Sequence, residues 1–407
     1  MNDSSARRLN RRRFLRSAGL VAAGLGALPS ATTFGQNTVT MPFANGVRDL
    51  VSYPQKRPLI RLTARPPQLE TPFSVFNESV LTPNDAFFVR YHLSEIPTVI
   101  DTNKFRAEIK GEVNTPLTLS LDDLKSFEPV EIVAVLQCSG NSRGFANPRV
   151  GGGQSGNGTM GNARWKGARL KDVLAKAGLK AGAKQVTFNG LDGPKLPATP
   201  DFVKALDVDH AMDGEVMLAY EMNGDSLPML NGFPLRLVVP GYYGTYWVKH
   251  LNEITVINNT LENFWMKTAY RIPDNACACV EPGAKMINSV PINRYNVRSF
   301  ITSLADGQTI KAGQSVEVRG IAFDGGYGID KVLFSDGKNG WRDTQLGQDL
   351  GKYSFREWKG QFTPAAGDHE LKSCATNRIG QSQPSAPLWN PSGYMRNVIE
   401  TVRVKAV

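Results

Sequence analysis

Short runs of apolar residues, each ended by glycine, proline, asparagine or aspartate, recur along this chain of 407 residues. Runs of four to eight residues that stop at turn residues are typical of β-strands, whereas amphipathic helices need longer stretches with a period of 3.6 residues. Two stretches favour short helices: one follows a capping serine, Ser120, and the other ends near Gly178. The pattern therefore predicts an α+β fold rather than a helical bundle.

The pattern changes near residue 288, and this change divides the chain beyond its first 36 residues into two predicted domains. Residues 37–287 mix strands with short helices and begin with an irregular, proline-rich lead-in that extends to about residue 80. Residues 288–407 hold short runs, most of them rich in Val, Ile and Phe, between turn residues. This pattern of short apolar runs between turn residues predicts an Ig-like β-sandwich, although the Cys…Trp…Cys spacing of antibody domains is absent. The runs are 299–304, 315–322, 329–334, 353–362, 369–375 and 398–404.

The first 36 residues have the composition of an export signal. A basic segment, residues 10–16, precedes an apolar run, residues 18–28, and then a group of small residues. The paired arginines before Phe14 fit a twin-arginine signal, which exports folded proteins. The sequence therefore predicts a periplasmic protein whose cofactor is inserted before export. The apolar run is too short and too rich in glycine and alanine for a stable membrane span.

The basic character of the chain is concentrated in this signal. Its first 17 residues hold six arginines against one aspartate, which accounts for half of the net charge of +10. No run of lysine or arginine follows, so nucleic acid is not an expected partner. A modestly basic protein would instead suit an anionic substrate that is drawn to a local cationic patch.

The few cysteines and histidines argue against several kinds of metal site. Four cysteines are too few for a disulfide scaffold, and there is no Cys-x-x-Cys-His motif for covalent haem. The four histidines include no His-x-x-x-His pair, so neither a zinc site nor a di-iron site is expected. Cys277 and Cys279 are expected to be free thiols, although their pairing stays open.

The strongest candidate for chemistry is Cys138. An apolar run, residues 132–136, predicts a buried strand that stops at this cysteine and enters a polar turn ending at Arg143. A nearby positive charge favours the thiolate, which is the form that binds metals or acts as a nucleophile. Free cysteines are often plain core residues, so this context alone leaves both interpretations open. The glycine-rich loop that follows, residues 144–162, is long enough to form a wall of a site and to offer backbone amides to an anion.

Cations and aromatic rings recur at positions that suit an anion. Phe88, Arg90 and His92 alternate, so on a strand their side chains would share one face. Arg236 and Lys249 flank a turn that contains glycine. Such a pair suits a phosphate or another anion, although surface salt bridges would explain it as well.

Five segments together resemble the sulfite oxidase family of mononuclear molybdenum enzymes, and within it the bacterial periplasmic sulfite dehydrogenases. The resemblance runs from about residue 72 to the C-terminus, and it implies a molybdopterin-binding α+β domain followed by a β-sandwich that forms a homodimer. The segments are Phe-Phe-Val-Arg-Tyr-His (87–92), Leu-Gln-Cys-Ser-Gly-Asn-Ser-Arg (136–143), residues 163–174, residues 218–228 and the turn at 231–249.

The resemblance also implies roles for individual residues. Cys138 would be the thiolate ligand of molybdenum, with the remaining sulfur ligands supplied by molybdopterin. Arg90 and Arg143 would line the pocket for the substrate anion, and Tyr270 would stand near the oxo group of the metal. The residues implied to hold molybdopterin are Phe88, His92, Asn231, Arg236 and Lys249.

The chain departs from the family's animal members at two points. Asn231 stands where they carry histidine, which leaves that cofactor contact open. A further substrate-binding arginine near their sandwich has no clear counterpart, and Lys352 and Arg356 are both candidates.

The activity implied by the resemblance is the oxidation of sulfite to sulfate at a Cys-ligated molybdenum–molybdopterin centre. The electrons would pass to a separate cytochrome c or another periplasmic acceptor. Two alternatives share the fold: a sulfane dehydrogenase and a methionine sulfoxide reductase. Arg90 with Arg143 favours sulfite over the reductase, because a small dianion needs two pocket cations. An alternative of another class is a periplasmic anion-binding or adhesion protein in which the sandwich carries the function.

Overall fold

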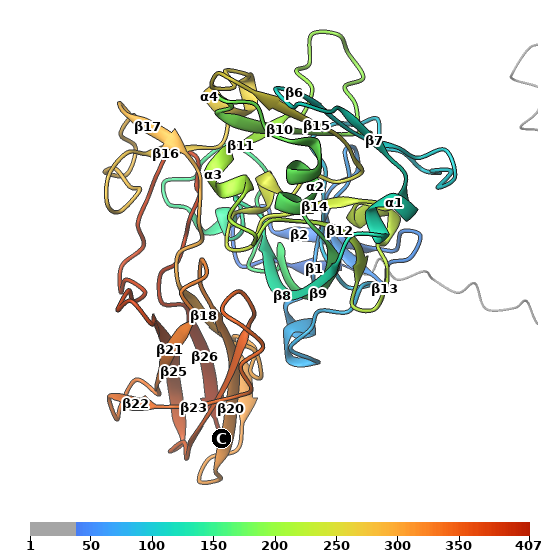
Figure 1. The fold of residues 1–407 in the computed structure, drawn as a ribbon. Helices are drawn as coiled ribbons and strands as arrows, with labels where there is room; N and C mark the ends of the chain where they lie inside the picture. The colour runs from blue at the N-terminus through green and yellow to red at the C-terminus, as the bar shows by residue number, and fades with distance from the viewer. Residues whose placement is uncertain (1–37) are drawn as a thin grey trace, which may run out of the picture. The chain divides into compact units, whose positions relative to one another are not determined.

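The computed structural model describes residues 38–407, which form several β-sheets and four short α-helices (Figure 1). The predicted signal peptide, residues 1–36, lies outside the described residues. Within the part of the chain that is described, no helix is both long enough and apolar enough to cross a membrane.

The segment predicted as an irregular lead-in forms most of a five-stranded antiparallel sheet, so that prediction was wrong. Its strands have two to five residues each, too few for a period of two to show among the prolines. Their buried side chains form a small core that includes Leu59, Leu69 and Tyr91. In order across the sheet, the strands are β1 (Thr38–Thr40), β2 (Val47–Val51), β3 (Leu59–Thr63), β4 (Gln68–Glu70) and β5 (Val89–Arg90).

Two further sheets form the centre of the N-terminal region. One has the order β11 (Lys204–Asp207), β10 (Gln185–Gly190), β15 (Leu251–Ile257), β6 (Ala107–Gly111) and β7 (Leu117–Leu119). The other has the order β13 (Asp225–Ser226), β12 (Met217–Met222), β9 (Met160–Arg169) and β8 (Pro129–Gln137), and β14 (Arg236–Val238) also pairs with β12. Strands β6 and β15 run parallel, and the other pairs in these two sheets are antiparallel, so both sheets fit the predicted α+β class.

The two predicted helices form where their sequence signals place them. Helix α1 (Leu121–Lys125) begins with a capping box, in which Ser120 and Asp123 bond to each other's backbone amides. Helix α2 (Leu170–Ala177) ends at Gly178, whose φ of +69° suits a residue without a Cβ atom. Two shorter helices are α3 (Val208–Ala211) and α4 (Phe264–Lys267). Single 3₁₀ turns occupy η2 (Phe73–Asn77), η3 (Arg143–Phe145), η4 (Met229–Asn231) and η5 (Gly244–Tyr246).

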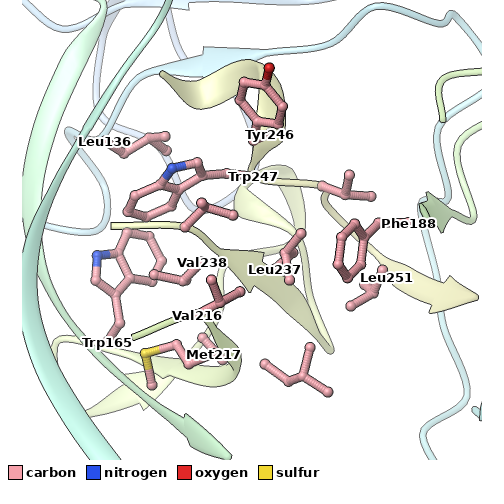
Figure 2. Close-up of a cluster of buried hydrophobic side chains, with 14 of the residues drawn as sticks. Leu136, Trp165, Phe188, Val216, Met217, Leu237, Val238, Tyr246, Trp247 and Leu251 are labelled. Atoms are coloured by element: carbon pink, nitrogen blue, oxygen red, sulfur yellow. The ribbon is translucent and has the colours of Figure 1, made fainter. Parts of the chain in front are cut away.

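A core of aromatic and aliphatic side chains supports the strand that ends at Cys138. Figure 2 shows Trp165 of β9 and Trp247 after η5 in this core beside Leu136 of β8, and the two indole rings lie 5.5 Å apart, edge to face. The indole nitrogen of Trp165 also donates a hydrogen bond of 3.0 Å to the Ala134 carbonyl oxygen. The end of β8 is therefore held by packing and by a buried hydrogen bond.

The C-terminal region is the predicted β-sandwich, with two sheets around a core that contains Phe334 and Trp358 (Figure 1). The first sheet has the order β18 (Arg298–Ile301), β20 (Val316–Phe323), β24 (Arg356–Phe362) and β23 (Gln345–Leu346). The second has the order β19 (Gln308–Ile310), β26 (Thr401–Ala406), β25 (Gly367–Asn377), β21 (Ile329–Ser335) and β22 (Trp341–Asp343). A hairpin of β16 (Arg271–Pro273) and β17 (Ser289–Pro291) precedes the sandwich.

Residues beyond 288 bond directly to the strand that carries the candidate thiol. The Tyr295 hydroxyl donates to the Val135 carbonyl oxygen at 2.7 Å, and the Val135 amide donates to the Tyr353 carbonyl oxygen at 2.9 Å. Strand β8 is therefore positioned by both regions of the described chain.

Candidate active site

One cavity gathers most of the residues singled out in the sequence. Cys138 lies at its wall, directly after β8, where the Cys138 amide bonds to the Thr159 carbonyl oxygen at 2.9 Å. The chain then turns sharply, and Ser142 adopts a φ of +70°, which is uncommon for a residue with a side chain. The cavity is lined by Phe88, Arg90, His92, Leu136, Cys138, Ser139, Asp192, Phe202, Leu230, Asn231, Arg236, Gly244, Thr245, Trp247, Val248, Lys249 and Tyr270.

Residues 88–92, which include strand β5, present one face to this cavity. Phe88, Arg90 and His92 all line it, as their alternation predicted, whereas Tyr91 between them is buried in the small core of the first sheet. Lys249 donates a hydrogen bond of 2.7 Å to the Arg90 carbonyl oxygen. The backbone of β5 is therefore tied to the turn that carries Lys249.

Tyr270 and His92 form a hydrogen-bonded pair inside the cavity wall. The imidazole of His92 stacks on Phe202, with ring centres 3.8 Å apart. Burial, together with the positive charges of Arg90 and Lys249, holds the pKa of His92 well below its usual range. Tyr270 has a φ of +57°, a strained value for an aromatic residue, and such strain persists where the surrounding structure imposes it. The pair is thus neutral and fixed in position.

A buried cationic wall faces this pair. Burial lowers the pKa of Lys249 to about 7, although the carboxylate of Asp192 opposes the shift. Burial also lowers the pKa of Arg236 to about 10, so its guanidinium stays charged at neutral pH. Neither cation forms the salt bridge to Glu253 or Asp225 that would have explained it as a surface residue. Two buried cations at one wall would stabilise an anionic group bound there.

Polar atoms without a hydrogen-bond partner line the same cavity, and they indicate which hydrogen bonds a bound anion could make. Ser139 Oγ, Thr245 Oγ1 and Arg236 Nε are buried, and they find no hydrogen-bond partner among the described residues. Buried polar atoms are normally hydrogen-bonded, so a group bound in the cavity could supply the partners that these three lack. A large polar anion that accepts several hydrogen bonds fits this donor set, and molybdopterin with its phosphate has that chemistry.

Asn231 is placed in the cavity wall, but the protein already uses both ends of its amide. Its Oδ1 accepts a hydrogen bond of 2.5 Å from Lys56, and its Nδ2 donates to the Phe88 carbonyl oxygen at 3.0 Å. Lys56 was missed in the sequence because it lies in the segment taken as irregular. Asn231 therefore shapes the wall, and its side chain is occupied by these protein contacts.

Arg143 does not line the main cavity. Its guanidinium lies over the ring of Tyr394, 4.9 Å from the ring centre, and its Nε donates to the Ser392 carbonyl oxygen at 3.0 Å. The two candidates for a further cation also lie elsewhere: Lys352 bonds to Glu215 at 2.5 Å, and Arg356 faces Asp349 at 3.5 Å. Neither Lys352 nor Arg356 is among the residues that line the cavity.

The backbone amides of the glycine-rich loop do bind an acidic group, but this group is a side chain of the protein. The amides of Gly156 and Gly158 donate to the two carboxylate oxygens of Glu70, at 2.9 and 2.8 Å. The expectation that these amides serve a bound ligand was wrong, because a buried carboxylate from β4 reaches them first.

Cys277 and Cys279 form a disulfide, so the expectation of free thiols was wrong. Spacing alone did not reveal this, since a single intervening residue is also compatible with two reduced thiols. Cys138 and Cys374 are the free cysteines of the described chain.

Two further residues at the site, Asp192 and Lys204, were not predicted from the sequence. Asp192 lines the cavity just after β10, and a polar residue at the end of a buried strand is a pattern that could have indicated it. Lys204 is completely buried beside the site, where its ammonium lies over the rings of Tyr246 and Tyr270. A lone lysine in a strand gives no such indication.

Comparison with known families defines the class of protein. Residues 93–265 match the oxidoreductase molybdopterin binding domain, and residues 289–407 match the Mo-co oxidoreductase dimerisation domain. The protein is therefore a molybdopterin-dependent oxidoreductase with a molybdenum cofactor, which argues against a passive anion-binding or adhesion protein.

Similarity to individual proteins then gives the family. The chain is 34% identical over 373 residues to the mitochondrial sulfite oxidase of Rattus norvegicus, a match that covers 87% of this chain and 67% of that protein. It is 32% identical over 336 residues to the sulfite oxidase of Arabidopsis thaliana, covering 78% of this chain and 83% of that protein. The chain belongs to the sulfite oxidase family, and it spans about two thirds of the length of the mammalian relatives.

A solved structure supports the same fold. The chain is similar to the sulfane dehydrogenase SoxCD from Paracoccus pantotrophus, with a TM-score of 0.72 and 23% sequence identity. The match covers 97% of this chain and 96% of that one. The predicted sulfite oxidase fold with a C-terminal β-sandwich is therefore confirmed.

Proposed function

We propose that the protein oxidises sulfite to sulfate and passes the electrons to a separate periplasmic acceptor such as cytochrome c. The observation that carries this proposal is that Cys138, Arg90 and Tyr270 line one cavity together with the buried Arg236 and Lys249. A soft thiolate, a pocket cation and a neutral donor are the groups that oxidation of a small oxyanion at a thiolate-bound metal requires. The relatives described above are sulfite oxidases, which supports the same substrate for this protein.

In this proposal the wall of the cavity holds the cofactor. Cys138 would supply the thiolate to molybdenum, Arg236 and Lys249 would bind the anionic end of molybdopterin, and Ser139 and Thr245 would bond to its polar groups. Phe88, His92 and Asn231 would shape the remaining wall. When bound, the cofactor supplies a two-electron redox centre capable of oxygen-atom transfer.

The chain's own groups would then bind and orient the substrate. Arg90 would offset the charge of sulfite and of the sulfate product, because charge-assisted hydrogen bonds are stronger than neutral ones. Tyr270 would act as a hydrogen-bonding group that adds no charge, held in position by the neutral imidazole of His92. Arg143, which packs on the ring of Tyr394 outside the main cavity, would supply a second positive charge near the substrate anion.

We further propose that two copies associate through residues 289–407, the region that matches the dimerisation domain. The periplasm is the proposed location, since the first 36 residues resemble a twin-arginine signal. An acceptor that receives electrons here would dock weakly and briefly, as partners in electron transfer do.

The test is sulfite-dependent reduction of ferricyanide and of cytochrome c, measured beside the molybdenum content of the purified protein. Cys138→Ser is expected to abolish turnover, while Cys374→Ser, a matched change at the other free cysteine, is expected to keep it. A Cys138→Ser protein that oxidises sulfite at the wild-type rate would refute the role of the thiol. Parallel assays with thiosulfate and methionine sulfoxide decide between sulfite and the two alternatives that share the fold.

A further inference from the structure

A tight turn near the C-terminus reaches the candidate active site. Asn390 is buried, and its side chain organises the turn: Oδ1 accepts from the Tyr394 amide at 3.1 Å, and Nδ2 donates to the Tyr394 carbonyl oxygen at 2.9 Å. The same Nδ2 donates to the Ala278 carbonyl oxygen at 3.2 Å. Met395, the next residue, has a φ of +62°, a strained conformation for this side chain. The turn is thus fixed from several directions around Tyr394.

The ring of Tyr394 lies between two residues implied in substrate binding. It stacks on Tyr270 with ring centres 5.6 Å apart and planes only 9° from parallel. The guanidinium carbon of Arg143 lies 4.9 Å from the centre of the same ring. Tyr394 therefore contacts both Tyr270, which lines the main cavity, and Arg143, which does not.

The space around Arg143 is shaped by residues that lack a side chain. A Cβ atom at Gly140 or at Gly152 would lie 2.7 Å from Nη1 of Arg143, and one at Gly393 would lie 3.0 Å from its Cγ. Real Cβ atoms essentially never approach other atoms to 2.7 Å, and a contact of 3.0 Å is unusually tight, so the missing side chains leave room for the arginine. The Ser392 carbonyl oxygen fixes the Nε end of the same group. The guanidinium therefore lies in a slot next to these glycines, and it packs against the ring of Tyr394.

Tyr394 also lines a second cavity, which includes Phe145, Trp389 and Arg396. The main cavity contains Tyr270 but neither Tyr394 nor Arg143. The ring of Tyr394 thus touches a wall residue of the main cavity and borders the second cavity as well. A smaller side chain at this position would leave Arg143 free to swing toward the second cavity.

From these contacts we propose that Tyr394 is a positioning residue that holds Arg143 and Tyr270 in place for binding of the substrate anion. The inference rests on the proposed function, since it assigns the turn at 390–394 to the same anion pocket. It places part of the specificity for a small anion in the C-terminal region, on a residue that does not line the main cavity.

The first test compares Tyr394→Ala with Tyr394→Phe in the molybdenum-loaded enzyme. Loss of a stacked ring and of a cation–π contact is expected to raise the KM for sulfite about tenfold, with a much smaller change in kcat. Tyr394→Phe keeps the ring and is expected to keep the KM within about twofold of the wild-type value. Tyr327→Ala removes an exposed tyrosine of the same region and serves as the control.

A second variant and a second readout separate this role from a general loss of structure. Gly140→Ala would place a methyl group 2.7 Å from Nη1 of Arg143, so it is expected to displace the guanidinium and to raise the KM in the same way. Sulfate affinity of the loaded protein, measured by titration calorimetry, is expected to fall in Tyr394→Ala and to stay unchanged in Tyr327→Ala.

A wild-type KM in a fully loaded Tyr394→Ala protein, or equal damage from Tyr394→Phe and Tyr394→Ala, would overturn the inference. So would a sulfate affinity that is equal in the wild type and in Tyr394→Ala, or no sulfate binding by either. Failure of the wild type to oxidise sulfite would instead refute the proposed function. In that case the sulfate titrations still decide the inference about Tyr394.

Discussion

Arg298, on the first strand of the sandwich, donates a hydrogen bond of 3.0 Å from its Nη2 to the hydroxyl oxygen of Ser142, in the turn that follows Cys138. The arginine is almost completely buried, and Glu400 faces the same nitrogen at 3.5 Å. The guanidinium of Arg298, from the C-terminal region, therefore supports the turn that follows Cys138, the candidate ligand of molybdenum. Displacing the arginine would leave the turn without this support.

Arg298→Met is expected to lower the free energy of unfolding by about 1.5 to 3 kcal/mol, because the buried Ser142 hydroxyl loses the charged donor that Arg298 supplies. Arg319→Met is the matched control, since Arg319 is exposed and its pair with Glu317 spans 3.8 Å. The control is expected to cost less than about 1 kcal/mol. Urea unfolding of the three proteins checks the difference, and equal midpoints for Arg298→Met and the wild type would contradict the structural role.

Arg90→Gln is expected to raise the KM for sulfite roughly 10- to 100-fold, because a hydrogen bond to a charged group contributes about 1.5 to 3 kcal/mol. The strand is expected to persist, since Lys249 bonds to the backbone of Arg90 and not to its side chain. Arg61→Gln on the neighbouring strand β3 removes an arginine that pairs with Asp49, and it serves as the control. Steady-state kinetics at constant ionic strength provide the measurement, and a larger effect in the control would count against the assignment.

The local patterns in the sequence predicted elements well where the signal lies within one segment. The apolar run before Cys138 became β8, the capping serine Ser120 begins α1, and Gly178 ends α2. The alternation of Phe88, Arg90 and His92 placed three side chains in one cavity. Each of these signals depends on neighbours in the chain, so one sequence is enough to detect it.

The failures concern partners that are distant in the sequence. Glu70 takes the amides of Gly156 and Gly158, which are 86 and 88 residues away along the chain, and no local pattern links a carboxylate to such a loop. The contact between Tyr394 and Tyr270 is also one between distant parts of the chain, because the turn that carries Tyr394 lies far beyond Tyr270 in the sequence. Sequence periodicity reports which face a residue occupies, but it does not report which distant segment covers that face.

Lys249→Met is expected to weaken cofactor binding by about 10- to 100-fold, the range typical for residues that support a metal site, and so to lower the molybdenum content of the purified protein. Methionine keeps most of the packing of the lysine stem but removes the charge proposed to meet the cofactor's anionic end. Lys166→Met is the control, because Lys166 is partly exposed and pairs with Glu221 at 3.2 Å. Metal analysis of proteins made in one host checks this, and an undiminished content in Lys249→Met would remove that lysine from the cofactor wall.

The raised pKa of Glu70 predicts how the free energy of unfolding depends on pH. Burial raises the pKa of its carboxyl to about 7, although the amides of Gly158 and Gly156 oppose the shift. The folded protein therefore keeps a proton that the unfolded chain loses near pH 4.5. The stability contributed by this group is fully present below pH 4.5 and is lost as the pH rises toward 7.

Glu70→Gln removes this titration, so its comparison with the wild type isolates the effect. Between pH 5 and pH 8 the unfolding free energy of the wild type is expected to fall by about 2 to 3 kcal/mol relative to Glu70→Gln. Glu317→Gln, at an exposed carboxylate, controls for general effects of charge and is expected to show no such slope. Chemical denaturation at several pH values supplies the data. A constant difference between the wild type and Glu70→Gln would mean that the two amides keep Glu70 charged in the folded protein, and that burial does not dominate its pKa.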